Sequence, residues 1–277
     1  MLAKLDELLN DAVLRPYAVP AFNVFGYEDA AAVVEAAEEM NAPVILATNA
    51  VAVTHIPVEI WGGMLRSLAE KAKVPVCVHL DHGKSFHIVA KAIRAGYSSV
   101  MFDGSALPLA ENIRRTREIV KMAHAFGVPV EAEIGSVGYS DAGGESIYTD
   151  PEEAQQFAEQ TEVDALAVAI GTIHRMQSQT AVIQFDRLEQ IQKRVSVPLV
   201  LHGATGVSDE DMKKLIQTRI AKVNIGTALR MAFGRTLREE MEKHPDEFDR
   251  IRLFQQPMRR VKETAMRKIA LLGFNAV

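Results

Sequence analysis

The sequence predicts an α/β protein of the (β/α)8 TIM barrel class, with an extra helix at the C-terminus. Short apolar runs alternate with amphipathic segments eight times along the chain, and several runs are almost wholly aliphatic, as buried parallel strands are. Prolines recur where these runs begin, and each marks the end of a helix-to-strand turn because the residue before a proline avoids the helical conformation. Eight units at near-even spacing favour a closed barrel over a doubly wound sheet.

The elements follow in order along one domain, expected to span residues 1–277, because no low-complexity linker or abrupt change in composition divides the chain. The predicted strands are Ala21–Val24, Val44–Thr48, Val74–Leu80, Ser99–Phe102, Val130–Ile134, Ala165–Ile170, Leu199–Leu201 and Lys222–Ile225. The amphipathic segments between them include Asp29–Met40, Val58–Lys71, Ala110–Phe126, Pro151–Gln160 and Asp209–Gln217. Ala228–Lys243 and Pro257–Leu272 are expected to be the eighth helix and the C-terminal extension.

Composition excludes several classes of function. The net charge of −5, with no stripe of lysines and arginines, argues against a nucleic acid as partner. No apolar stretch approaches the roughly 20 residues that span a bilayer, and the N-terminus lacks the layout of a signal peptide. The only cysteine, Cys77, lies within a predicted strand and is expected to be a buried apolar residue. These features predict a cytoplasmic protein.

Three histidines occupy the same place in different repeats. His82, His174 and His202 each lie near the C-terminal end of an apolar run. Such strand ends converge on one rim of a barrel, where the active sites of this fold lie. Three imidazoles that meet there match the protein ligands of a catalytic zinc, which leaves a fourth position open for substrate. Any one of them alone would more commonly be a hydrogen-bonded core residue, so the shared position carries this prediction.

Two carboxylates are expected at the same rim. Glu133 ends a predicted strand and is a candidate metal ligand, a partner that orients an imidazole, or a substrate contact, with a lysine ion pair as the alternative. Asp81 directly precedes His82 and is placed to exchange a proton with a substrate hydroxyl, or else only to orient an imidazole. His79 shares a strand face with Asp81 and is expected to be a hydrogen-bonded core or supporting residue.

Three loops complete the predicted site. Glycine-bearing turns follow the seventh and eighth strands at His202–Gly206 and Asn224–Thr227, where barrels of this class usually bind phosphate through backbone N–H groups. The loop Ser136–Thr149 is long, polar and glycine-rich, as mobile lids often are. Its Asp141 and Glu145 are candidate acids or bases, with solvated surface carboxylates as the equal alternative.

These motifs together resemble the class II, zinc-dependent ketose-bisphosphate aldolases, which include the fructose- and tagatose-bisphosphate aldolases. The resemblance covers nearly the whole chain, in the order found in that family. It rests on the segments Ala21–Val24, Leu80–Gly83, Val100–Ser105, Val130–Gly135, Gly171–His174, Leu201–Gly203 and Lys222–Thr227.

The resemblance implies a role for each matching residue. The zinc ligands are His82, His174 and His202, with Glu133 as an alternative ligand or a residue beside the metal. Asp81 is the acid/base at the hydroxyl of the carbon where the chain is cut, and Asp141 aligns with the mobile-loop glutamate that moves the carbon-bound proton. The substrate and phosphate contacts, with dihydroxyacetone phosphate as the ketone half, are Asn23, Gly203, Thr205, Asn224, Gly226 and Thr227.

One departure concerns the residue after the second zinc histidine. The family has a glycine there, which lets the backbone approach a phosphate or a monovalent cation, whereas this chain has Arg175. Two alternatives stay open for this side chain: it reaches an anionic group of the substrate, or it points away from the site.

The expected reaction is the cleavage or formation of a ketose (bis)phosphate. A metal that polarises the ketone supplies the Lewis acid, and a lysine Schiff base would be the competing solution. No lysine ends a predicted strand: Lys84 lies past its turn and Lys222 begins the last strand. A sugar-phosphate isomerase or epimerase and a non-catalytic aldolase-like partner subunit are the alternative functions. The resemblance also implies a homodimer or homotetramer.

Overall fold

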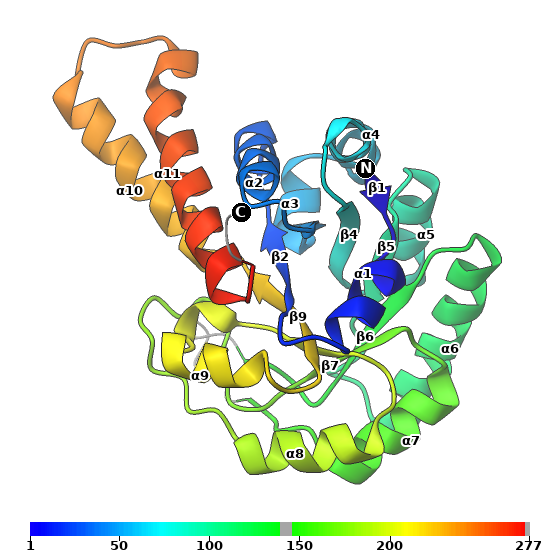
Figure 1. Ribbon diagram of the computed structural model, residues 1–277. Helices are drawn as coiled ribbons and strands as arrows, with labels where there is room; N and C mark the ends of the chain where they lie inside the picture. The colour runs from blue at the N-terminus through cyan, green and yellow to red at the C-terminus, as the bar shows by residue number, and fades with distance from the viewer. Residues whose placement is uncertain (139–145, 275–277) are drawn as a thin grey trace.

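Eight parallel strands close into a barrel in the computed structural model, which describes residues 1–138 and 146–274 (Figure 1). Each strand pairs with its neighbours in the sequence, and pairing between the last strand, β9, and the first barrel strand, β2, completes the ring. The predicted (β/α)8 barrel is therefore confirmed. The barrel strands are β2 (Val19–Asn23), β3 (Val44–Thr48), β4 (Val76–Gly83), β5 (Ser99–Phe102), β6 (Val130–Ile134), β7 (Ala165–Val168), β8 (Leu199–Leu201) and β9 (Ile220–Ile225).

Two strand boundaries differ from the prediction in a way that bears on the site. Strand β4 continues to Gly83, so His82 lies within the strand, where the register with β5 shifts between Leu80 and Gly83. Strand β9 begins at Ile220, which makes Lys222 its third residue and not its first. The extension of β4 contains the polar residues Asp81 and His82, because backbone pairing defines a strand whereas the prediction followed apolar side chains.

Helices surround the barrel, and those that follow the strands are mostly near the predicted bounds. The helices between barrel strands are α2 (Tyr27–Glu39), α3 (Ala50–His55), α4 (Val58–Lys71), α5 (Phe86–Arg94), α6 (Leu109–Ala125), α7 (Pro151–Thr161), α8 (Phe185–Arg194) and α9 (Asp209–Leu215). After β9, α10 (Thr227–Lys243) forms a hairpin with α11 (Arg250–Leu271), which also packs along α2. Figure 1 shows the far end of this hairpin projecting away from the barrel.

The start of α11 corrects the predicted C-terminal helix. The helix begins at Arg250, well before the predicted Pro257, and this proline lies buried in its interior. Proline is most favourable at the start of a helix because it lacks an N–H group, which is why the pattern suggested a start there. Asp249 caps the real start, where its side chain accepts a hydrogen bond from the N–H of Ile251 at 2.8 Å.

The N-terminus seals one end of the barrel. Strand β1 (Leu2–Ala3) pairs with β4, and helix α1 (Leu5–Ala12) buries Leu5 and Leu9 completely. These leucines pack in one apolar cluster with inward residues of the strands, among them Ile45, Cys77 and Met101. Burial raises the pKa of the Cys77 thiol to about 12, in agreement with the expected apolar role. Among the described residues, no helix has the length and apolar character needed to cross a membrane.

Candidate metal and substrate site

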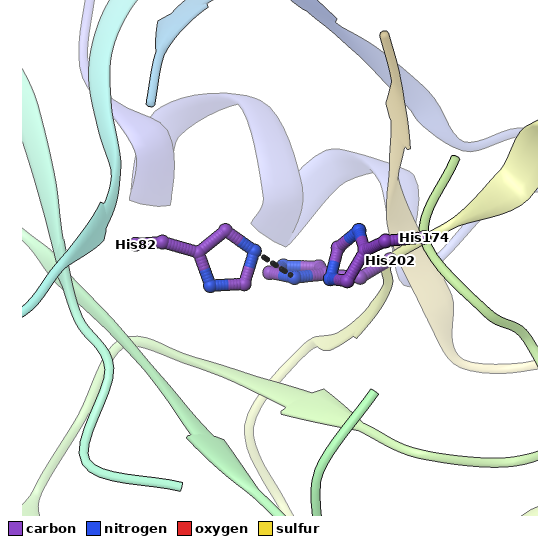
Figure 2. Close-up of side chains that lie close together, drawn as sticks. All are labelled: His82, His174 and His202. Carbon is purple, nitrogen blue, oxygen red and sulfur yellow. Dashed lines mark hydrogen bonds between the residues drawn. The ribbon is translucent and has the colours of Figure 1, made fainter. Parts of the chain in front are cut away.

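The opposite end of the barrel brings the three predicted histidines together. Their rings come from β4, from the loop after β7 and from the residue after β8, and Figure 2 shows them facing one another. The ring centroid of His82 lies 5.1 Å from that of His174 and 4.7 Å from that of His202. One ring nitrogen of each lies within 4.8 Å of the others. The backbone N–H of His174 donates to Gly138 at 2.8 Å, which anchors the loop that carries it.

A carboxylate orients His82. Its Nδ1 lies 2.6 Å from Oδ2 of Asp103, a contact that turns Nε2 toward the other histidines. Lys84 contacts the same carboxylate oxygen. The backbone of His82 adopts φ +51°, a left-handed conformation unusual for a residue with a side chain. Burial lowers the pKa of His82, but the charges of Asp81, Asp103 and Glu133 outweigh burial and raise it to about 9.

A second carboxylate orients His202 in the same way. Nε2 of this completely buried imidazole lies 2.8 Å from Oε1 of Glu131, so Nδ1 faces Nε2 of His82 at 3.0 Å. Metal-binding histidines typically carry such a carboxylate on the ring nitrogen remote from the metal. Burial and the positive charges of His82 and His202 hold the pKa of His174 well below its ordinary value of 6.5, so His174 offers a neutral ring.

Glu133 supplies an oxygen to the same cluster. Its Oε2 is 3.4 Å from Nδ1 of His202 and 3.9 Å from Nδ1 of His82. This buried oxygen has no hydrogen-bond partner among the described residues, while Oε1 accepts a bond from Val137 N–H at 3.2 Å. A buried carboxylate oxygen without a donor is costly unless a cation compensates it. Three imidazoles with this oxygen are a donor set that fits zinc.

Asp81 is held by two amides. Asn23 Nδ2 donates to its Oδ2 at 2.8 Å and Asn224 Nδ2 donates to its Oδ1 at 3.0 Å. The same Oδ1 lies 3.9 Å from Nε2 of His82. Burial acts to raise the pKa of Asp81, but the positive charges of His82, His202 and Lys222 outweigh it and hold the pKa well below its usual range. The carboxylate is therefore ionised and able to accept a proton.

One cavity joins these groups to the predicted phosphate turns. Asp81, His82 and His174 line it, whereas His202 and Glu133 are buried beside it and are not among its lining residues. Every predicted substrate and phosphate contact lines the same cavity: Asn23, Arg175, Gly203, Thr205, Asn224, Gly226 and Thr227. The cavity therefore brings these turns within reach of the histidines. Gly226 directly precedes α10, and a helix N-terminus favours negative charge.

Two residues that line the cavity, one in the turn after β8 and one in the loop after β7, have a left-handed backbone. Gly203 has φ +69°, and a Cβ there would lie 2.8 Å from the carbonyl oxygen of Ile173, so only glycine fits. Arg175 has φ +63°, so the chain keeps the backbone conformation that favours glycine although the residue is an arginine. A side chain in this conformation costs about 1–2 kcal/mol. Arg175 is among the residues that line the cavity.

Sequence reasoning missed several residues of the site. Asp103 follows β5 at the same rim, so the rule that selected Glu133 would also have found it. Glu131 and Lys222 are completely buried charges in apolar strands, a pattern that indicates a buried ion pair. Arg230 and Phe25 also line the cavity, with the guanidinium 4.8 Å from the ring centroid. The predicted Asp141 and Glu145 lie outside the described residues.

The chain is similar to known aldolases along almost its whole length. The family model of class II fructose-bisphosphate aldolases matches residues 3–276. The YdjI aldolase from Escherichia coli K12 is 40% identical, with a TM-score of 0.87 over 99% of this chain and 98% of that chain. A putative fructose-1,6-bisphosphate aldolase from Coccidioides immitis is 27% identical, with a TM-score of 0.88 over 98% and 96%.

The fructose-bisphosphate aldolase from Campylobacter jejuni has the same fold, at 22% identity and a TM-score of 0.84 over 99% of this chain and 96% of that chain. The matched family model, which extends over almost the whole chain, and the barrel with its rim of histidines and carboxylates lead to one assignment. The chain belongs to the class II fructose-bisphosphate aldolase family.

Proposed function

We propose that this protein is a zinc-dependent aldolase that cleaves or forms a ketose (bis)phosphate, with dihydroxyacetone phosphate as the ketone half and an aldehyde as the other. The observation that carries the proposal is the ionised Asp81, which lines one cavity with His82 and His174 and with the glycine-bearing turns. A base, a metal-ligand set and an anion-binding surface are the three parts that this reaction needs.

Each group has a defined task in the cleavage direction. Asp81 takes the proton of the hydroxyl on C4 while the C3–C4 bond breaks and the C4 oxygen becomes the aldehyde carbonyl. The electron pair of the broken bond moves toward the ketone oxygen, and Asp141 is proposed to return a proton to C3. The turns at Gly203–Thr205 and Gly226–Thr227 hold the phosphate.

The residues that would hold zinc are His82, His174 and His202, with Glu133 beside them. When bound, zinc supplies a Lewis acid that stabilises the charge developing on the substrate, an effect worth several kcal/mol. Asp103 and Glu131 keep two of these imidazoles oriented through their remote nitrogens. The proposal includes a monovalent cation near the phosphate, which a comparison of activity in sodium, potassium and tetramethylammonium salts tests.

The decisive experiment measures triose-phosphate release from a panel of ketose 1-phosphates and ketose 1,6-bisphosphates, with and without a zinc chelator. We expect release from at least one substrate, its loss on chelation and its recovery when zinc is restored. Rearrangement of the sugar without triose-phosphate release would indicate an isomerase or epimerase instead. Absence of turnover with zinc bound would contradict the aldolase proposal.

The proposal extends to a homodimer or homotetramer in the cytoplasm. Apolar side chains are exposed at the projecting end of the α10–α11 hairpin, with Phe248 94%, Ile251 75% and Met241 53% accessible. Exposed apolar residues gathered in this way favour contact with another protein surface. Light scattering on the purified chain and on a Phe248→Ser/Ile251→Ser variant tests the assembly, and the variant is expected to dissociate. The free, buried thiol of Cys77 supports a reducing compartment.

A further inference from the structure

The barrel interior contains a lysine that the proposed reaction does not use. Lys222, on β9, is completely buried, and its ammonium group lies 2.7 Å from Oε2 of Glu131 and donates to Oδ1 of Asn224 at 2.7 Å. It is not among the described residues that line the cavity. A buried charge is costly to maintain. Each of its two partners in turn contacts a residue of the site: Asn224 contacts the proposed base Asp81, and Glu131 contacts the proposed metal ligand His202.

The first partner leads to the base. An ammonium group only donates hydrogen bonds, so the amide of Asn224 must turn its oxygen toward Lys222. This fixes the amide nitrogen toward Asp81, to which it donates at 3.0 Å. Without Lys222 the amide oxygen loses this donor, and only the bond to Asp81 restrains the amide. The lysine thereby anchors the amide whose nitrogen meets the base.

The second partner leads to the metal ligands. Glu131 gives one oxygen to the ion pair with Lys222 and the other to Nε2 of His202, at 2.8 Å. Its other close neighbour is His79, whose Nε2 lies 3.6 Å away and whose Nδ1 bonds Ser99 at 2.9 Å. Lys222 therefore compensates the charge of a carboxylate that would otherwise be buried among imidazoles, and it holds that carboxylate against His202.

We propose that Lys222 is a positioning residue that aligns the base Asp81, through Asn224, and the metal ligand His202, through Glu131. We call the link through Asn224 the first arm and the link through Glu131 the second arm. Only the first arm rests on the proposed function, because it concerns the catalytic base. The second arm concerns the geometry of the histidine cluster and holds whatever the substrate is.

Two variants test the two arms. Lys222→Met keeps the length of the side chain and removes its charge, while Lys222→Met/Glu131→Gln also neutralises the partner and leaves an amide that can bond His202. Lys268→Met, in a half-buried lysine on α11, is the matched control. The measurements are zinc affinity by chelator competition, the visible spectrum of the cobalt-substituted protein, and kcat and KM for the ketose substrate.

We expect Lys222→Met to lower zinc affinity and kcat by about 10–100-fold each, the usual effect of removing a group that orients a ligand. The cobalt spectrum is expected to change, and KM to change much less than kcat. In the double variant, zinc affinity and the cobalt spectrum are expected to return toward those of the wild type while kcat stays low, because Asn224 remains unanchored. The control is expected to match the wild type in every measurement.

Three results would overturn the inference. A folded Lys222→Met protein with the zinc affinity, cobalt spectrum and kcat of the wild type would remove both arms. Recovery of kcat in the double variant would remove the arm through Asn224, and a double variant with zinc affinity still as low as in Lys222→Met would remove the arm through Glu131. If the wild type itself shows no turnover, the proposed function fails, while zinc affinity and the cobalt spectrum still decide the second arm.

Discussion

The two ends of the barrel are built from the same strands but have opposite chemistry. Cys77, His79 and Asp81 are successive inward-facing residues of β4, and their side chains change from apolar at the amino end to charged at the carboxyl end. At the amino end, Leu5 and Leu9 of α1 complete an apolar cluster. At the carboxyl end the buried side chains are imidazoles, carboxylates and amides that hold one another. One end of the barrel therefore contributes stability without chemistry, whereas the other maintains buried charge for function.

We expect the greatest loss of activity when Asp81, the proposed proton acceptor at the carboxyl end of the barrel, is replaced. Asp81→Asn is expected to lower kcat about 10²–10⁴-fold because proton transfer from the substrate hydroxyl loses its acceptor. Zinc content is expected to stay near that of the wild type, since Asp81 is not among the proposed ligands. Steady-state kinetics with metal analysis on the same sample checks both. Full activity in the variant would show that another group is the base.

Leu9 tests the amino end of the barrel, where it is completely buried. Leu9→Ala is expected to lower the free energy of unfolding by about 2–5 kcal/mol because it leaves a cavity between α1 and the strands. Denaturant unfolding measures this loss, and Leu14→Ala is the control, since Leu14 is 83% exposed. At temperatures where the variant remains folded, kcat is expected to equal that of the wild type. A changed kcat would contradict the separation of the two ends.

A smaller effect is expected from a partner of a histidine. Asp103→Asn removes the charge that faces Nδ1 of His82 at 2.6 Å, and zinc affinity is expected to fall by about 10–100-fold. Chelator competition measures the affinity, with Asp246→Asn, in an exposed aspartate, as the control. If the Asp103 variant binds zinc as tightly as the control does, then Asp103 does not orient this ligand.

Asp29, outside the histidine cluster, is a carboxylate whose burial is not outweighed by positive charges. Burial raises the pKa of Asp29, near the start of α2, to about 6 from its ordinary value of 3.8, although the N–H of Phe25 donates to it at 2.9 Å. A raised folded-state pKa favours folding while the group is protonated, and this contribution is lost as the pH rises from about 4 through 6.

Asp29→Asn is therefore expected to be more stable than the wild type at pH 8, by about 1 kcal/mol after allowance for partial exposure. The difference is expected to vanish near pH 4, where the aspartate is protonated. Denaturant unfolding at both pH values measures it, and an equal difference at the two would contradict a buried, poorly compensated charge.

Short sequence patterns were sufficient to predict the order of the strands and helices and the candidate site residues at the carboxyl rim of the barrel. Strand-forming runs, proline-marked turns and glycine turns are properties of neighbouring residues, so the sequence carried them directly. The rule that strand ends converge then brought His82, His174 and His202 into one prediction. Even the departure at Arg175 was visible from sequence, although not its left-handed backbone.

The partners inside the barrel were decided by the tertiary structure alone. Asp103 faces His82 across the neighbouring ends of β4 and β5, and Glu131 lies between His202 and Lys222, which follow it in the sequence by 71 or more residues. No local periodicity encodes such a choice. The position of α1 was likewise decided by the tertiary structure, because its apolar face packs against the inward residues at the amino end of the barrel. Local sequence patterns were sufficient to predict a barrel and the residue types at its rim. Closure of the barrel decided which charges meet, because a buried charge is stable only beside partners that the folded chain brings to it.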